Sequence, residues 1–183
     1  MSSQLLTLRH VGKIFASGTA ALDGLDLQVG EAEFLSLLGP SGCGKSTALR
    51  IIAGLMQPSA GLVEWRGGRP ADIGFVFQEP TLMPWARVWD NVYLPMRLRG
   101  FSRAAAAAQV DATLRLVGLD EFARAYPREL SGGMRMRVSI ARALALKPPI
   151  LLMDEPFAAL DEITRLKLND DLLRLKAELG TTI

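Results

Sequence analysis

The run G-P-S-G-C-G-K-S at positions 39–46 constrains the fold of this chain more than any other feature. Residues 33–38 before it have the apolar pattern of a buried strand, and residues 45–53 read as the opening of a helix. Glycines in such a loop let successive backbone N–H groups point inward, where they and the helix N-terminus can hold a phosphate. A strand, a glycine-rich loop and a helix in this order predict an α/β fold with a phosphate-binding loop.

The same run supplies the side chains that phosphate chemistry requires. Lys45 is expected to reach the β- and γ-phosphates of ATP, and the Ser46 hydroxyl to ligate the Mg²⁺ ion that bridges them. A chance glycine-rich turn is the alternative, which the flanking strand and helix disfavour. The residues that we expect to surround the nucleotide here are Gly39, Ser41, Gly42, Cys43, Gly44, Lys45, Ser46 and Thr47.

A second group of candidate residues follows the apolar run at 150–153. Such a run predicts a strand buried on both faces of a parallel sheet, and ligands gather at the carboxyl ends of these strands. Asp154 is therefore placed to hold Mg²⁺, and Glu155 to polarise the water that attacks the γ-phosphate. An ordinary strand followed by a solvated acidic turn is the alternative for an isolated Asp-Glu pair, but it accounts poorly for one beside a phosphate loop.

The run L-S-G-G at 130–133 precedes a predicted helix over 134–145. Ser131 is a favourable N-cap residue, and a helix N-terminus preceded by two glycines is open to an anion. Taken alone, the run fits a plain capped helix equally well. Its meaning therefore depends on the motifs around it.

With the phosphate loop, the L-S-G-G run and the acidic pair in this order, the chain resembles the ATP-binding cassette (ABC) family, the nucleotide-binding subunits of ABC transporters. The resemblance covers almost the whole chain. It implies an α/β fold with a P-loop NTPase (RecA-like) core, a small N-terminal antiparallel β subdomain and an inserted α-helical subdomain. We expect one domain over 1–183, incomplete at its C-terminus, with 1–78 and 147–183 in the core lobe and 79–146 in the helical lobe.

The resemblance also implies roles for residues outside these two groups. Phe15 is the aromatic residue that stacks on adenine, and Gln78 is the glutamine that senses Mg²⁺ and the γ-phosphate. Lys45, Gln78 and Glu155 are then the catalytic residues, and Ser46, Gln78 and Asp154 the metal ligands. Two chains, expected to form a homodimer, sandwich two ATP molecules head to tail. The residues that reach the nucleotide of the second chain are Ser131, Gly132, Gly133, Met134 and Asp161.

Two features depart from the family pattern. Met134 stands where the family usually has glutamine, and a thioether cannot make the hydrogen bonds of a carboxamide. The family histidine that contacts the γ-phosphate has no counterpart, because the only histidine, His10, lies in a predicted early strand and is expected to be structural. A predicted helix over 161–179 leads to residues 181–183, which read as the beginning of an apolar strand, so we expect the sequence to be a fragment.

The stretch E-P-T-L-M-P-W at 79–85 resembles one that is common in ABC importers of nitrate, sulfonates, taurine and related small molecules. In those systems this region docks a short helix of the membrane permease, and a separate binding protein delivers the solute. Two prolines stiffen the loop, and a methionine beside Trp85 makes an adaptable apolar surface. The alternative is that Trp85 and Trp89 simply pack the helical lobe.

Composition limits the remaining possibilities. The chain has 183 residues, of which 49% are hydrophobic, enough for one sizeable core. A net charge of +2 is too small to indicate a nucleic-acid partner. The sequence has neither an apolar run of about eighteen residues nor a secretory leader. Together with these absences, the resemblance to ABC transporter subunits implies a peripheral protein on the cytoplasmic face of the plasma (inner) membrane. The single cysteine, Cys43, is expected to fill space in the loop.

Two other classes of function stay open at this point. One is an ABC-type ATPase of DNA repair or translation, although such chains carry long insertions or paired cassettes. The other is a module that binds ATP with little turnover, which the missing histidine favours. The presence of Lys45, Gln78, Asp154 and Glu155 favours catalysis. The transported solute does not follow from the sequence, because the cassette never touches it.

Overall fold

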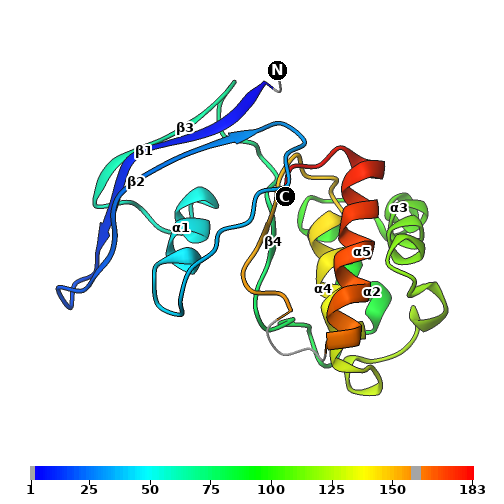
Figure 1. Cartoon of the computed structure of the whole chain (residues 1–183). Helices are drawn as coiled ribbons and strands as arrows, with labels where there is room; N and C mark the ends of the chain where they lie inside the picture. The colour runs from blue at the N-terminus through cyan, green and yellow to red at the C-terminus, as the bar shows by residue number, and fades with distance from the viewer. Residues whose placement is uncertain (1–2, 158–161) are drawn as a thin grey trace.

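The computed structural model describes residues 3–157 and 162–183 of the chain. An antiparallel sheet lies on one side of the molecule, a bundle of helices on the other, and a short parallel sheet runs between them (Figure 1). The antiparallel sheet has the strand order β2-β1-β3, with β1 at Gln4–Ile14, β2 at Ala20–Gly30 and β3 at Ala60–Trp65. The small N-terminal antiparallel subdomain expected from the sequence is therefore confirmed.

Strand β1 is continuous but has an irregularity between Leu8 and Val11, where the pairing with β2 shifts and His10 has a positive φ of 49°. The carboxylate of Asp26 on β2 accepts a hydrogen bond from the His10 backbone N–H at 2.8 Å and contacts the imidazole Nδ1 at 2.7 Å. The backbone hydrogen bond lowers the pKa of Asp26 below its ordinary value of 3.8. His10 thus lies at an exposed irregularity of the sheet, in keeping with the structural role expected for it.

The parallel sheet contains β4 at Gly74–Val76 and β5 at Leu151–Met153, so the strands expected around 73–77 and 150–153 are confirmed. Thr182 makes a parallel bridge to Ile150 on the other side of β5.

The strand expected over 33–38 is not formed, and this expectation was wrong. The segment runs alongside residue Ile183, whose N–H donates to the Glu33 carbonyl and whose carbonyl accepts from the Leu35 N–H, both at 2.8 Å. Two hydrogen bonds hold the segment in place but do not make a ladder, because a strand needs a neighbour along its length. The segments therefore lie in the order 33–35, 182–183, β5 and β4.

Five α-helices and two short 3₁₀ turns complete the described part of the chain. Their first turns follow local rules: Gly44 precedes α1, and the Ser102 hydroxyl accepts from the Ala105 N–H at the start of α3. The helices are α1 Lys45–Ile52, α2 Val88–Leu98, α3 Arg103–Leu116, α4 Gly132–Leu144 and α5 Glu162–Leu179, and the turns are η1 Asp120–Phe122 and η2 Pro127–Glu129. No helix in the described ranges has both the length and the apolar content that a membrane span needs.

Helix α4 is shared by two hydrophobic clusters. Val138 and Ala141 pack in the helical lobe with the α3 stripe predicted from the sequence, which includes Val110 and Leu114. Met136, Ile140 and Leu144 belong instead to the cluster that contains Val76 of β4, Leu151 of β5 and Leu172 of α5. The helix therefore has one face on the bundle and another on the parallel sheet.

The packing of α3 predicts a large effect of truncating Leu114, which is fully buried in the helical lobe. Leu114→Ala should lower the free energy of unfolding by about 2–5 kcal/mol, through lost burial and the cavity left behind. Leu98→Ala, at a position that is 78% exposed, is the control and should change it by less than about 0.5 kcal/mol. Urea unfolding of both variants gives the comparison, and equal losses would contradict this description of the core.

Candidate functional site

The phosphate-loop pattern lies between the 33–38 segment and α1, with glycine where the backbone demands it. Gly44 has φ 98°, a conformation that disfavours residues with a side chain. A Cβ atom at this position would lie 2.3 Å from the carbonyl oxygen of Ala21 on β2. The loop therefore passes so close to the antiparallel sheet that only glycine fits.

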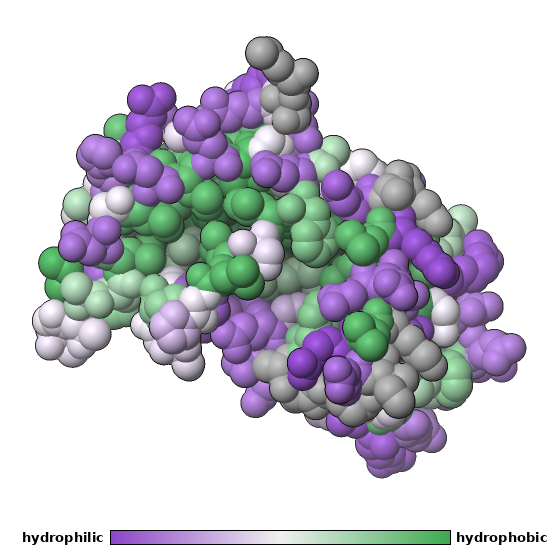
Figure 2. All heavy atoms as spheres, viewed as in Figure 1, coloured by the Kyte–Doolittle hydropathy of each residue, from purple (hydrophilic) through white to green (hydrophobic). Residues whose placement is uncertain are grey.

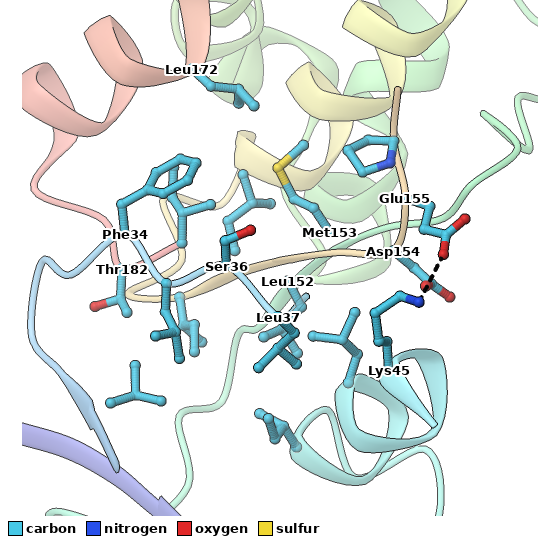
Figure 3. A pocket seen from close by; sticks show the side chains of 18 of the residues that line it. Phe34, Ser36, Leu37, Lys45, Leu152, Met153, Asp154, Glu155, Leu172 and Thr182 are labelled. Carbon is cyan, nitrogen blue, oxygen red and sulfur yellow. Dashed lines mark ion pairs between the residues drawn. The ribbon is translucent and has the colours of Figure 1, made fainter. Parts of the chain in front are cut away.

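Lys45 folds back over this loop. Its ammonium donates hydrogen bonds to the carbonyl oxygens of Gly39 and Pro40, both at 2.9 Å, and lies 3.9 Å from the Cys43 thiol. It also forms an ion pair with Glu155 at 3.4 Å (Figure 3). A cation is thus held at the mouth of the loop, where an incoming phosphate can replace its present partners.

The acidic pair meets the loop at the carboxyl end of β5. The Ser46 hydroxyl donates to Oδ1 of Asp154 at 2.7 Å, across 108 positions of sequence. The Asp154 side chain is largely buried, and its backbone N–H donates to the Val76 carbonyl on β4 at 2.9 Å. Glu155 has a positive φ of 45°, a costly conformation for a residue with a side chain. The structure thus brings Lys45, Ser46 and both carboxylates to one place.

Ser46 and Asp154 have the chemistry of a magnesium site. Mg²⁺ prefers oxygen ligands and is held by one or two carboxylates together with the phosphates of the nucleotide. Among the described residues, the ion pair to the loop lysine is made by Glu155 and not by Asp154. The Asp154 side chain therefore lies beside the Ser46 hydroxyl without being paired to Lys45, where a cation could be bound.

A cavity of about 310 Å³ lies beside this group of charges. Its walls are mainly apolar and come from the 34–37 segment, β5 and α5, with Leu37, Leu152 and Leu172 among the lining residues (Figure 3). On the face of the molecule that is turned toward the viewer in Figure 2, apolar residues form a band across the middle. Such walls do not suit a triphosphate, whereas the loop offers backbone N–H groups and the Lys45 ammonium.

For the other residues predicted for the site, no hydrogen bond or ion pair to this group of side chains is found in the described part of the chain. Phe15 lies in the turn between β1 and β2, part-exposed, with the Lys13 ammonium 5.9 Å from its ring centroid. Gln78 is exposed, two residues after the end of β4. Asp161, together with Ala159 and Leu160 of the same predicted loop, lies outside the described residues. The roles of these residues remain predictions.

The L-S-G-G run begins α4 as expected. The Ser131 hydroxyl accepts a hydrogen bond from the Met134 N–H at 3.2 Å, and Ser131 and Gly132 are exposed while Gly133 is buried. The Met134 side chain packs against the core of the helical lobe. The thioether that replaces the family's glutamine therefore contributes to packing, and its role toward a second nucleotide stays a prediction.

The two tryptophans of the helical lobe behave differently. The indole N–H of Trp89 donates to Asp111 at 2.8 Å, its ring lies 4.0 Å from the Arg103 guanidinium, and the side chain packs against the lobe core. Trp85 is 77% exposed. The packing alternative therefore holds for Trp89 and not for Trp85.

Sequence reasoning missed two polar residues, Asn91 and Arg142, that hold the loop around Trp85. Asn91 is fully buried in α2, and Arg142 extends from α4 to the backbone of Pro80 and Thr81. A signal for Asn91 was available in the sequence, because Asn91 lies three residues after Val88 and next to Val92, on what is the buried face of α2. Arg142 gave no such signal, since its partners lie about sixty positions away in sequence.

Comparison with known proteins places this geometry in a family. Residues 22–158 match the profile of the ABC transporter family. The chain belongs to this family. The aliphatic sulfonates import ATP-binding protein of Xanthomonas axonopodis pv. citri is 47% identical over 189 residues, covering 100% of this chain and 74% of that protein. The taurine import ATP-binding protein of Rhizobium johnstonii is 48% identical over 179 residues, covering 93% and 68%.

The ABC fold is also found among solved structures. An ATP-binding cassette solved as a dimer in a post-hydrolysis state, bound to ADP and Pi, superposes with a TM-score of 0.86 at 37% identity, covering 97% of this chain and 85% of that chain. The expected P-loop NTPase (RecA-like) core with its antiparallel and helical subdomains is therefore confirmed. The chain spans about two thirds of the length of the curated relatives that it matches, 66% and 62% of two of them.

The exposed thiol of Cys43 offers a direct test of the loop as the nucleotide site. Labelling Cys43 with a bulky maleimide should abolish ATP binding, because the adduct would fill the space over the loop. Equilibrium binding of a fluorescent ATP analogue, with the extent of labelling followed by mass spectrometry, gives the measurement. Cys43→Ser treated with the same reagent is the control and should still bind. Normal binding by fully labelled protein would place the nucleotide elsewhere.

Proposed function

We propose that this ABC chain binds ATP with Mg²⁺ and, as part of a dimer, hydrolyses it to drive the import of a small solute through a membrane permease. The observation that supports this most is the meeting of the phosphate loop with the acidic pair, through Ser46 with Asp154 and Lys45 with Glu155. Phosphoryl transfer depends mainly on positioning and charge stabilisation, and this arrangement supplies both.

Each residue then has a distinct task. The loop N–H groups and Lys45 hold the phosphates, so Lys45 exchanges its present carbonyl partners for phosphate oxygens. Ser46 and Asp154, with Gln78, would hold Mg²⁺, which would supply positive charge beside the phosphates. Once Lys45 has moved to the phosphates, Glu155 is free to accept a proton from the attacking water. Phe15 is the proposed stacking partner of adenine.

The dimer follows from the exposed N-terminus of α4. Ser131 and Gly132 present an open helix end, which suits the γ-phosphate of an ATP molecule held by a second chain. We propose that Asp161 and the backbone around Met134 also contribute to this contact. Closure of two chains on two nucleotides is then part of the mechanism.

Glu155→Gln should trap this closed state. An amide cannot accept the proton of the attacking water, so ATP stays intact and holds the two chains together. Size-exclusion chromatography with light scattering in saturating MgATP should give a stable dimer for Glu155→Gln and a monomer for the control Glu155→Gln/Lys45→Ala. A variant that stays monomeric while it binds ATP would undermine the proposed closure.

The solute and partners come from the relatives and from the 79–85 stretch. Both compared importers carry sulfonate-type names, so we propose a sulfonate, taurine or a related anion such as nitrate as solute. The permease would dock on the helical lobe, residues 79–146, at the exposed Trp85. This places the chain at the cytoplasmic face of the membrane, with a solute-binding protein in the complete system. No observation favours a nucleic-acid partner.

Trp85→Ala should uncouple transport while leaving ATP binding intact, because an exposed aromatic side chain contributes to docking and little to the fold. Uptake of taurine into vesicles that hold the complete transporter, together with ATP binding by the same preparation, measures both effects. Leu62→Ala is the matched control, because Leu62 is also an exposed apolar residue but lies on β3 of the antiparallel sheet and not in the helical lobe. Uptake that stays at the wild-type rate in Trp85→Ala would count against docking at this residue.

A further inference from the structure

Residues 80–87, here called the Trp85 loop, join the end of β4 to α2 without regular secondary structure. Their central side chain, Trp85, is exposed, and Thr81 has a positive φ of 45° although it is not glycine. Such a backbone conformation is costly and persists only where the surroundings impose it. Two polar side chains outside the loop hydrogen-bond to it, and one of them contacts Thr81 itself.

The first is Arg142, on the C-terminal half of α4. Its guanidinium donates to the carbonyl oxygens of Pro80 and Thr81, both at 2.9 Å, and to the Thr81 hydroxyl at 3.1 Å. Burial lowers the pKa of Arg142 through desolvation of the cation, but an arginine still carries its charge at neutral pH. The planar fork therefore fixes the first two residues of the loop.

The second is Asn91, on the first turn of α2. Its Oδ1 accepts from the Met83 N–H at 2.8 Å, and its amide donates to the carbonyl oxygens of Met83, Ala86 and Arg87 at 3.1–3.2 Å. The side chain is fully buried, so water does not compete for these groups. The side-chain amide of Asn91 thus holds the second half of the loop through hydrogen bonds to three of its residues.

We propose that Arg142 and Asn91 are positioning residues that hold the Trp85 loop in one conformation, and that Arg142 passes displacements of α4 to this loop. The N-terminus of α4 carries Ser131, and Pro80 follows Gln78 by two residues. A shift of α4 therefore reaches the residues beside Gln78 and Trp85 through the Arg142 side chain and its two charge-assisted hydrogen bonds to backbone. The transmission part of this inference rests on the proposed function, whereas the positioning part does not.

The variant Arg142→Lys tests the positioning role and the transmission role by separate measurements. Lysine keeps the charge but lacks the fork, so it cannot hold both carbonyl groups in the same geometry. Amide hydrogen exchange of the full chain, followed by NMR, should become roughly tenfold faster at Met83 and Ala86, the cost of about one or two lost hydrogen bonds. These two residues report on the loop because their N–H groups are hydrogen-bonded within a few residues of the Arg142 contacts at Pro80 and Thr81. The matched control is Arg137→Lys, which lies on the same helix and donates to the Val117 carbonyl, away from the loop. Amide hydrogen exchange at Met83 and Ala86 should be as slow in Arg137→Lys as in the wild type.

The second readout is the response to MgATP. In the wild-type chain MgATP should change the exchange rates of Met83 and Ala86, and in Arg142→Lys this change should be lost while the Kd for ATP stays within about twofold, because the variant leaves the phosphate loop untouched. Unchanged exchange in Arg142→Lys without nucleotide, or equal acceleration in α3 and the loop, would overturn the positioning role. A retained MgATP response would overturn the transmission. If the wild type binds no ATP, the proposed function fails, and the exchange rates without nucleotide still decide the role of Arg142.

Discussion

The hydrogen bond from Ser46 to Asp154 is the contact on which the candidate site depends. It joins the first turn of α1 to the carboxyl end of β5, two elements separated by 108 positions. Asp154 is in turn fixed by its backbone bond to Val76, so β4 enters the same arrangement. A largely buried carboxylate is costly to leave unpartnered, and the Ser46 hydroxyl satisfies it without neutralising its charge. The site is therefore stable as folded and still attractive to a divalent cation.

The parts of the fold that the sequence predicted are those set by local rules. Gly44 and the caps Ser102 and Ser131 act within one turn of a helix, and the buried stripe of α3 follows from helical spacing alone. The segment 33–38 shows the limit of such reasoning. Its composition favours a strand, but a strand also needs a hydrogen-bonding neighbour along its length, and here only two bonds to Ile183 are made.

The candidate site, like the fold, was predictable where a local motif names the residues and not where distant segments meet. The residues of the phosphate loop and the acidic pair could be named in advance, because their motifs carry their chemistry. The difference between Trp85 and Trp89 could not be predicted, since both lie in one short stretch. Only the tertiary contacts of Trp89 with Asp111, Arg103 and the core of the helical lobe distinguish the two side chains. The clamp on the Trp85 loop was hidden for the same reason, because it is built from long-range hydrogen bonds.

Helix α4 ties these observations together. Its 13 residues extend about 20 Å at the usual rise per residue, with Ser131 before one end and Arg142 near the other. Both of its faces are packed, one against α3 in the helical lobe and one against the parallel sheet. Close-packed interfaces of this kind shift as units and do not deform smoothly. A displacement at Ser131 would therefore move α4 as a unit, and the Trp85 loop would move with it because Arg142 ties the loop backbone to the helix.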